Sequence, residues 1–280
     1  EPTETGQADN PVRIGSKQFT ENMILAELYA IALEDNGIPV ERNFGIASAA
    51  IHPAQVSGEI DLYPEYTGTG LLSILQMDPL TDPQEVYDTV KQAFKSLYDI
   101  VWLEYSEAND GQGIAVTKAV SDQYGILTIS DLQKNAGNIR FASQGMFDER
   151  ADGLPALEAK YGPFKWKSSI VIDNSLKYET LKNDEADAIP AYTSEGMLTD
   201  PFFVLLEDDK KVWPPYNAAP VIRAGTLTAY PRIEDILNAI SAQLDTPKIT
   251  MLNASVDVEG REYEEVAREF YDSVKAAIPE

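Results

Sequence analysis

Short apolar runs alternate with amphipathic stretches along almost the whole chain. Runs of three to five apolar residues bounded by glycine, proline or polar residues predict buried strands. Stretches in which apolar residues recur every three or four positions predict helices that cover a sheet. The first such pair is a strand at 12–14, which ends at Gly15, and a helix at 20–35, which ends before Gly37. This alternation predicts an α/β architecture.

The remaining elements follow the same rules. Further strands are predicted at 40–44, 59–63, 100–103, 114–116, 139–142, 170–172, 186–189 and 219–223. Further helices are predicted at 82–97, 130–135, 154–161, 175–183, 232–244, 248–255 and 263–277. Pro64 is expected to break the strand at 59–63, because proline has no N–H for a ladder. No internal repeat is evident from the sequence.

Two turn-rich segments, at 109–113 and 213–217, divide the chain into a first, a middle and a last part. They predict two lobes joined by two crossings, with a ligand cleft between the lobes. The first lobe is then discontinuous (12–108 plus 217–280), and the second is 109–216. Residues 1–11 are polar and are interpreted as a tether, as in an exported product or a domain cut from a longer membrane protein.

Charge and composition exclude several classes of function. The chain has 22 Lys and Arg against 46 Asp and Glu, a net charge of −24, which repels phosphate backbones and argues against nucleic-acid binding. Most of this charge is interpreted as a solvated surface. The absence of cysteine excludes disulfides and thiolate nucleophiles. No apolar run approaches the roughly 18–20 residues of a membrane span.

The side chains that catalysis needs are scarce. His52 is the single histidine, so a multi-histidine zinc site is excluded, and a helix-entry or surface role is expected for it. No nucleophile elbow, phosphate-binding loop or dinucleotide fingerprint is present. The acidic pair at 184–185 and the acidic run at 207–209 are expected in exposed loops. We therefore predict no catalytic residue, metal or cofactor. A carboxylate-dependent hydrolase acting on a small cationic or sugar substrate stays open as the alternative.

Tyrosines and cationic residues gather beside glycine, proline or small polar residues where predicted strands end. Strand ends that face a crevice are where α/β proteins bind ligands. A lone tyrosine at such a place is more often half-buried packing, but several at different strand ends favour a binding site. The segments are 15–20, 63–70, 147–153, 190–196 and 213–216.

At these segments the chain resembles the substrate-binding components of osmoprotectant ABC importers, which bind glycine betaine, carnitine and choline. The motifs are Ile14-Gly15-Ser16-Lys17-x-Phe19-Thr20-Glu21, Tyr63-Pro64-Glu65-Tyr66-Thr67-Gly68-Thr69, Asp152-Gly153-Leu154-Pro155, Pro214-Pro215-Tyr216-x-Ala218-Ala219-Pro220 and Val258-Glu259-Gly260. The resemblance covers residues 12 to about 271. It implies a type II periplasmic-binding-protein fold that closes around its ligand by hinge motion.

The resemblance also implies an aromatic cage for a trimethylammonium group. The matching positions are Tyr66, Tyr192 and Tyr216. A quaternary ammonium has no N–H to donate, whereas aromatic faces attract it electrostatically. For a zwitterion, the resemblance suggests Lys17, Thr69 and Arg150 as carboxylate partners, with Ser16 in the same strand-end segment as Lys17. Ordinary ion pairs remain open as the roles of Lys17 and Arg150.

One cage position departs from the family pattern. The fourth tyrosine of the betaine and carnitine binders aligns with Gln112, and Asp110 lies beside it. An amide in place of a ring adds donors and acceptors to one wall, which suits a betaine with a larger polar substituent. The hypothesis favours ergothioneine, a histidine-derived betaine with an imidazole-thione, then carnitine, with glycine betaine or choline still open. Alternatively, Gln112 only replaces lost packing.

The expected partners are therefore a small quaternary-ammonium ligand and the membrane permease of an ABC importer. The protein is expected to be monomeric. It is also expected to work outside the cytoplasm in association with a membrane, as a lipid-anchored protein, a periplasmic protein or a domain fused to its permease.

Overall fold

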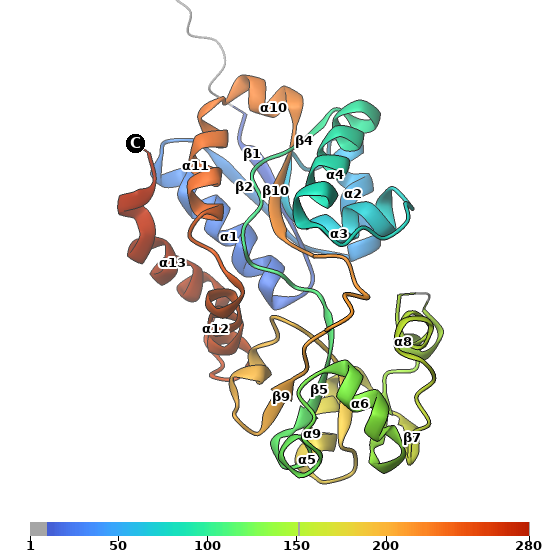
Figure 1. Cartoon of the computed structure of the whole chain (residues 1–280). Coiled ribbons are helices and arrows are strands. Elements are labelled where there is room, and N and C mark those ends of the chain that lie inside the picture. The colour runs from blue at the N-terminus through green and yellow to red at the C-terminus, as the bar shows by residue number, and fades with distance from the viewer. Residues whose placement is uncertain (1–9, 151, 280) are drawn as a thin grey trace, which may run out of the picture.

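The computed structural model describes residues 10–150 and 152–279, and within them the chain forms two α/β lobes (Figure 1). The chain passes from the first lobe to the second between β4 and β5 and returns between β9 and β10. The predicted two-lobed α/β fold is confirmed. Of the predicted tether, residues 1–9 lie outside the described residues.

Each lobe is built on a five-stranded mixed sheet. The first sheet has the order β2-β1-β3-β10-β4, formed by Val40–Ile46, Val12–Lys17, Leu62–Tyr66, Ala218–Arg223 and Ile100–Trp102. The second has the order β7-β6-β8-β5-β9, formed by Ser168–Val171, Arg140–Ser143, Ala188–Tyr192, Gln112–Thr117 and Phe203–Leu205.

Helices pack on both sheets and bury their apolar faces there. In the first part of the chain they are α1 (Thr20–Asp35), α2 (Ser48–Ser57), α3 (Thr67–Thr69), the π-turn η1 (Gly70–Ile74) and α4 (Pro83–Tyr98). In the second lobe they are α5 (Lys118–Tyr124), α6 (Ile129–Asn135), η2 (Ala136–Asn138), α7 (Met146–Glu149), α8 (Leu154–Tyr161), η3 (Asn174–Leu176), α9 (Lys177–Lys182) and η4 (Gly196–Thr199). The chain ends with α10 (Ala224–Ala229), α11 (Arg232–Ser241), α12 (Thr246–Asp257), α13 (Tyr263–Val274) and η5 (Lys275–Ala277).

Two sequence expectations in the first lobe are wrong. Strand β3 continues through Pro64, whose antiparallel partner on β10 is Pro220. On its other side β3 pairs with β1 only at Leu62. Pro64 therefore lies beyond the end of the β1–β3 ladder, where its missing N–H interrupts no pairing. His52 lies inside α2, a helix that the sequence did not predict, and its ring packs edge-on against Tyr98 with centroids 4.7 Å apart. Burial lowers the pKa of His52.

The two lobes repeat one topology, although the sequence showed no evident repeat. In each lobe the second strand of the sheet, β1 or β6, has parallel neighbours on both sides, and the fourth strand, β10 or β5, is antiparallel to the third. The repeat has a short sequence signature, Asp-x-x-Pro-x-Tyr-Thr, at 61–67 and again at 187–193. These two segments end β3 and β8, so each lobe places a tyrosine at the same point of its sheet.

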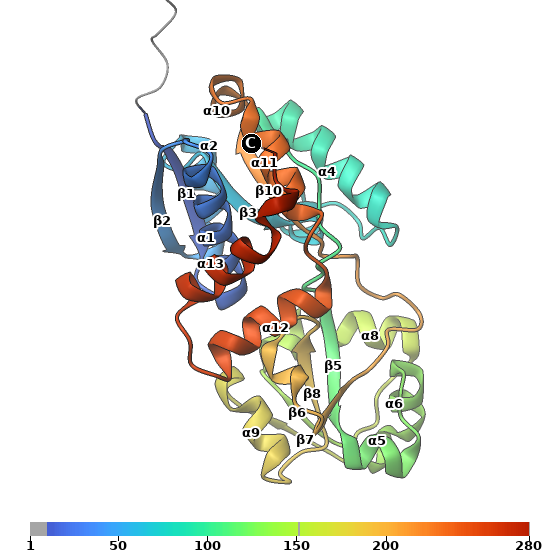
Figure 2. The same cartoon turned by 90° about the vertical axis from the view of Figure 1, so that its left-hand side faces the viewer.

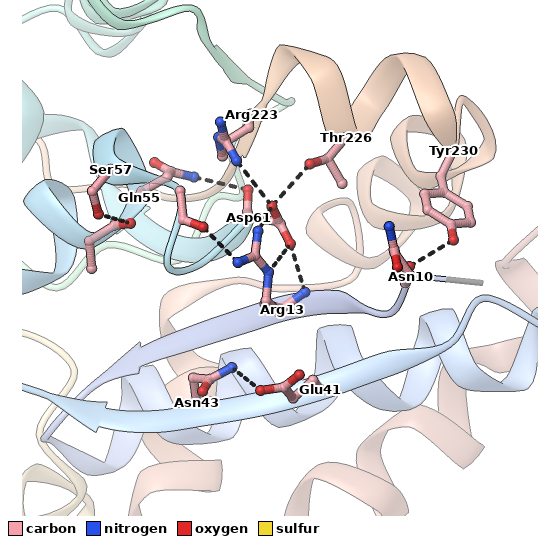
Figure 3. Close-up of polar contacts among 12 residues, drawn as sticks. Asn10, Arg13, Glu41, Asn43, Gln55, Ser57, Asp61, Arg223, Thr226 and Tyr230 are labelled. Atoms are coloured by element: carbon pink, nitrogen blue, oxygen red, sulfur yellow. Dashed lines mark hydrogen bonds and ion pairs between the residues drawn. The ribbon is translucent and has the colours of Figure 1, made fainter. Parts of the chain in front are cut away.

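An arginine–aspartate contact fixes each copy of this signature. Arg13 donates from its backbone N (3.0 Å) and from Nε (2.9 Å) to Asp61, as Figure 3 shows. Its Nη1 also donates to the Gly58 carbonyl (2.6 Å). Arg140 makes the same three contacts: its N (2.8 Å) and Nε (3.1 Å) donate to Asp187, and Nη1 donates to a carbonyl three residues before that aspartate (2.6 Å). The contacts therefore set the start of both tyrosine-bearing strands.

Helix α12 joins the lobes at a third place. The predicted boundaries assign it to the first lobe, and it does pack on α1, but it also packs on η4 of the second lobe (Figure 2). At Gly196 of η4 a Cβ would lie 2.5 Å from the backbone N of Ala254, so only glycine allows this approach. Helix α12 therefore contributes to both sides of the space between the lobes.

Candidate ligand-binding cleft

A cavity of about 490 Å³ lies between the lobes. Its walls come from the ends of β1, β3 and β8, from both crossings, from the segment around α7 and from α12. It is lined by Lys17, Phe19, Thr20, Glu21, Ser48, Tyr66, Thr69, Ser73, Asp110, Gln112, Arg150, Asp152, Asn174, Tyr192, Ser194, Glu195, Tyr216, Asn253 and Asp257. The structure therefore brings together eight of the nine residues predicted for the site.

Ser16 is the exception among the predicted site residues. It is fully buried and does not line the cavity. Its Oγ accepts a hydrogen bond from the backbone N of Gly45 at 3.0 Å. Successive side chains of a strand point to opposite faces, so Ser16 points away from the side that Lys17 occupies. Ser16 therefore supports the strand end rather than the cleft.

Tyr66 ends β3 and is held firmly in the first lobe. Its side chain is 3% exposed, and its hydroxyl donates to Glu21 Oε1 at 2.9 Å. Burial, followed by the charge of Glu21, raises the pKa of Tyr66 well above its usual value, so the phenol stays a neutral donor. Lys17 Nζ lies 5.1 Å from the ring centroid. The ring position is fixed before any ligand enters.

Lys17 is paired within its own lobe. Its Nζ donates to Glu65 at 2.5 Å, and Glu65 also accepts from the Tyr63 hydroxyl at 3.0 Å and from the backbone N of Tyr66 at 2.8 Å. All of these groups are buried. This ion pair holds Lys17 and Glu65 in place beside Tyr66. It argues against the predicted role of Lys17 as a free partner for a ligand carboxylate.

Tyr192 ends β8 and is the exposed counterpart of Tyr66 in the second lobe. Its side chain is 40% exposed, and Lys177 Nζ lies 5.6 Å from its ring centroid. Beside it, Arg150 donates from Nε and Nη2 to Asp152 at 2.8 and 2.5 Å. Gln112, directly opposite Tyr192 in the sheet register, also donates to Asp152 at 2.8 Å. Asp152 thus holds both polar groups at this wall.

Tyr216 lies on the returning crossing and packs against the first lobe. A Cβ added at Gly68 would lie 2.7 Å from its Cδ1 and 2.9 Å from the Pro215 carbonyl oxygen, so Gly68 permits this close approach. Burial, with the charge of Asp152 next, raises the pKa of Tyr216 to about 12. Thr69, one residue beyond Gly68, also lines the cavity.

A polar network at the cleft was missed by the sequence analysis. Glu21 Oε2 accepts from Asn253 Nδ2 at 2.9 Å, and the same Nδ2 donates to the Ser194 carbonyl at 2.8 Å. The Ser194 hydroxyl donates to Asp110 at 2.8 Å. The network therefore joins α1, α12, the second lobe and the outgoing crossing. Glu21 lay within a recognised motif, whereas nothing local in the sequence around Asn253 marks it.

The two carboxyl groups of this network have perturbed acidity. Burial raises the pKa of Glu21, and burial followed by the charge of Glu21 raises the pKa of Asp110 well above its usual value. The hydroxyl of Ser194 opposes the shift in both cases. Such a pair resists carrying two negative charges until a positive charge approaches.

The cleft as a whole suits a cation without N–H donors. Three tyrosine rings come from three separate segments, and five acidic side chains line the cavity against two basic ones. Within residues 10–150 and 152–279 there is no group of three or more His, Cys, Asp or Glu arranged to hold a metal ion. No described helix is long and apolar enough to cross a membrane.

Comparison with known proteins identifies the family. Residues 10–273 match the family described as "Substrate binding domain of ABC-type glycine betaine transport system". The ergothioneine transport permease/ergothioneine binding protein EgtU of Helicobacter pylori (strain G27) is 30% identical over 94% of the chain, and the chain spans 48% of that relative's length. The glycine betaine-binding protein YehZ of Escherichia coli (strain K12) is 31% identical over 94% of the chain and 90% of its own length.

The structural comparison agrees. A solved structure described as a glycine betaine/carnitine/choline ABC transporter superposes with a TM-score of 0.88 at 25% identity, covering 95% of this chain and 99% of the other. The family consists of transport proteins that bind solutes without transforming them, so the hydrolase alternative is set aside. The chain therefore belongs to the family of substrate-binding domains of ABC-type glycine betaine transport systems.

Proposed function

We propose that this protein captures a zwitterionic quaternary-ammonium compound outside the cytoplasm and delivers it to the permease of an ABC importer. We further propose ergothioneine as the preferred ligand, followed by carnitine, glycine betaine and choline. The observation that carries the proposal is the convergence of Tyr66, Tyr192 and Tyr216 on one acidic cavity.

The energetics of such a cage are favourable but incomplete. Each desolvated ring contributes roughly 0.5–2 kcal/mol to binding a cation, so three rings contribute about 2–6 kcal/mol. Micromolar affinity needs about 8 kcal/mol. Methyl burial and contacts to the other end of the ligand must therefore supply the remainder. Arg150 lines the cavity and stays our proposed partner for a ligand carboxylate, in exchange with or in addition to its contact with Asp152.

Gln112 supports the choice of a substituted betaine. It lies opposite Tyr192 in the sheet register, so it occupies the second-lobe wall of the cavity. Its amide adds hydrogen-bonding capacity where a fourth ring would close the cage. The ergothioneine binder of H. pylori and the glycine betaine binder of E. coli are about equally similar to the chain, so the choice of ergothioneine rests on Gln112. Mere packing by Gln112 is the competing explanation.

Calorimetric titration with ergothioneine, carnitine, glycine betaine and choline tests the proposal, with the ligand mass checked before and after incubation. We expect saturable 1:1 binding, unchanged ligand, and the highest affinity for ergothioneine. Binding of carnitine or glycine betaine more tightly than ergothioneine would refute the preferred ligand but leave the function intact. Failure of all four to bind, or consumption of any of them, would contradict the proposed function.

A further inference from the structure

A second cavity of about 410 Å³ adjoins the cleft on the side of the second lobe. The two cavities share Gln112, Arg150, Asn174 and Tyr192, so Tyr192 and Arg150 stand at the boundary between them. We call this second cavity the chamber. Residues that line only the chamber include Gln144, Lys177 and Ala191.

The repeat between the lobes explains why the chamber exists. Gln144 lies four residues after Arg140, as Lys17 lies four residues after Arg13, and the two arginines make matching contacts. By the same count from Asp61 and Asp187, Ala191 corresponds to Glu65. In the first lobe the Lys17–Glu65 ion pair fills the space beside the tyrosine. At the corresponding positions of the second lobe, the neutral amide of Gln144 replaces the lysine and the methyl group of Ala191 replaces the glutamate.

The chamber differs from the cleft in charge. Two basic side chains, Arg150 and Lys177, line it against the single acidic Asp173, whereas acidic side chains dominate the cleft. Lys177 is 3% exposed and is held by Glu195. Arg150 is paired with Asp152, so an anionic substituent in the chamber would share or displace the partners of these two basic groups, while Glu21, Asp110 and Asp257 remain in the cleft to attract the cation.

Gln144 is a weakly held polar group in the chamber. The one contact found for its amide among the described residues is a long one, from Nε2 to the Pro190 carbonyl at 3.5 Å. An amide can both donate to and accept from a ligand. The apolar surface beside it comes from Phe147 and Ile172. A flat polar ring or a carboxylate has both a surface to lie on and a group to bind.

We propose that the chamber is a second subsite, which takes the hydrogen-bond-accepting or anionic substituent of a quaternary-ammonium zwitterion larger than glycine betaine. This inference rests on the proposed function, because it requires the ammonium group to sit among the three tyrosines. A ligand no longer than glycine betaine would leave the chamber to water. The chamber would thus determine which betaines the cleft prefers.

Filling the chamber with the first lobe's own ion pair tests the inference. The double substitution Gln144→Lys with Ala191→Glu recreates the Lys17–Glu65 pair at the corresponding positions. Calorimetry should show at least a tenfold loss of affinity for ergothioneine and less than a threefold change for glycine betaine. The matched control is Gln123→Lys with Ala119→Glu, the same substitutions on exposed positions of α5. The control should bind both ligands as the wild type does.

Each other outcome has a definite meaning. Equal losses for both ligands, or no loss for either, would overturn the chamber subsite. So would wild-type protein that binds glycine betaine but not ergothioneine or carnitine, although the proposed function would then survive. Wild-type protein that binds no quaternary amine would refute the proposed function, and the subsite with it. If the double variant does not fold, Gln144→Met decides: we expect about a fivefold loss for ergothioneine alone, and an unchanged affinity ratio would contradict the inference.

Discussion

The two lobes carry the same tyrosine-bearing segment on the same sheet topology, but they treat it differently. In the first lobe Tyr66 is buried, donates to Glu21, and is backed by the Lys17–Glu65 pair. In the second lobe Tyr192 is 40% exposed, and the residue before it is an alanine. The first copy is built as a fixed surface, and the second leaves room beside the ring.

The difference suggests a division of labour within the cleft. A ring whose position is set by buried hydrogen bonds loses little conformational freedom when a cation binds, so its contribution to affinity is preserved. A half-exposed ring beside a cavity can accommodate substituents of several sizes. We infer that the first lobe supplies most of the affinity for the methylated nitrogen and that the second lobe distinguishes among the ligands that carry it.

Truncating the fixed ring should give the largest effect. Tyr66→Ala should lower affinity for the best ligand about thirtyfold or more, because a desolvated ring contributes about 2 kcal/mol and each 1.4 kcal/mol is a factor of ten. Removing so large a buried side chain should also lower the free energy of unfolding by about 3–5 kcal/mol. Calorimetry and denaturant unfolding measure the two quantities. Tyr66→Phe, which keeps the ring, should retain most of the affinity, and an equal loss in both variants would contradict the cage.

Truncating the exposed ring should separate affinity from stability. Tyr192→Ala should lower affinity about tenfold while leaving the thermal stability of the unliganded protein nearly unchanged, because this ring is 40% exposed whereas that of Tyr66 is 3% exposed. Thermal melts and titrations of the same preparation measure both. Phe202→Ala, at a similarly exposed aromatic residue that does not line the cavity, is the control. Wild-type affinity in Tyr192→Ala would remove this residue from the cage.

Restoring the fourth ring should change specificity more than affinity. Gln112→Tyr should improve binding of glycine betaine and weaken binding of ergothioneine, each by several-fold, because the ring closes the wall at which the chamber joins the cleft. The ratio of the two dissociation constants is the quantity to compare. A uniform weakening of all ligands would show that Gln112 serves packing alone.

The smallest expected effect is a dependence on pH. Burial raises the pKa values of Glu21 and Asp110, so the free protein retains a proton at pH values above the usual carboxyl range of about 4. A bound cation favours the ionised carboxylates, so the complex holds fewer protons and affinity should rise a few-fold as pH increases through the raised pKa values. Titrations in buffers of different ionisation enthalpy should detect the released proton.

The pH effect has a direct control. Glu21→Gln should flatten the dependence, whereas Asp122→Asn, at an exposed position on α5, should leave it unchanged. Other charged groups near the pair are Asp257, which raises the pKa of Glu21, and Glu195 and Lys17, which act on Asp110 in opposite directions. Affinity that falls with rising pH would contradict this assignment.

The sequence predicted the architecture well because apolar periodicity and turn residues are local signals. Helix α1 and the helix that begins at Pro83 after its Asp82 cap lie where the patterns placed them, and β1 begins where it was predicted but continues past Gly15 to Lys17. Helix α2 was missed because it buries few residues and contains Pro53. The repeat was missed because only a short signature survives in the sequence, and it becomes convincing once Arg13 and Arg140 are seen to make the same contacts.

The site was only partly predictable for a different reason. Tyrosines at strand ends are visible in a sequence, but the partners that fix them come from distant segments. Asn253 reaches Glu21 across 232 positions of sequence, and Gly68 matters because the ring of Tyr216 lies against it. Ser16 was misassigned because strand alternation, not proximity in sequence, decides which side chain faces the cleft.

A crystal structure of the protein with its tightest-binding quaternary amine tests the central claim most directly. We predict a methylated nitrogen within about 6 Å of the ring centroids of Tyr66, Tyr192 and Tyr216, with no protein hydrogen bond to that nitrogen. A nitrogen bound elsewhere in the cleft, or rings that turn away from it in the complex, would contradict the account.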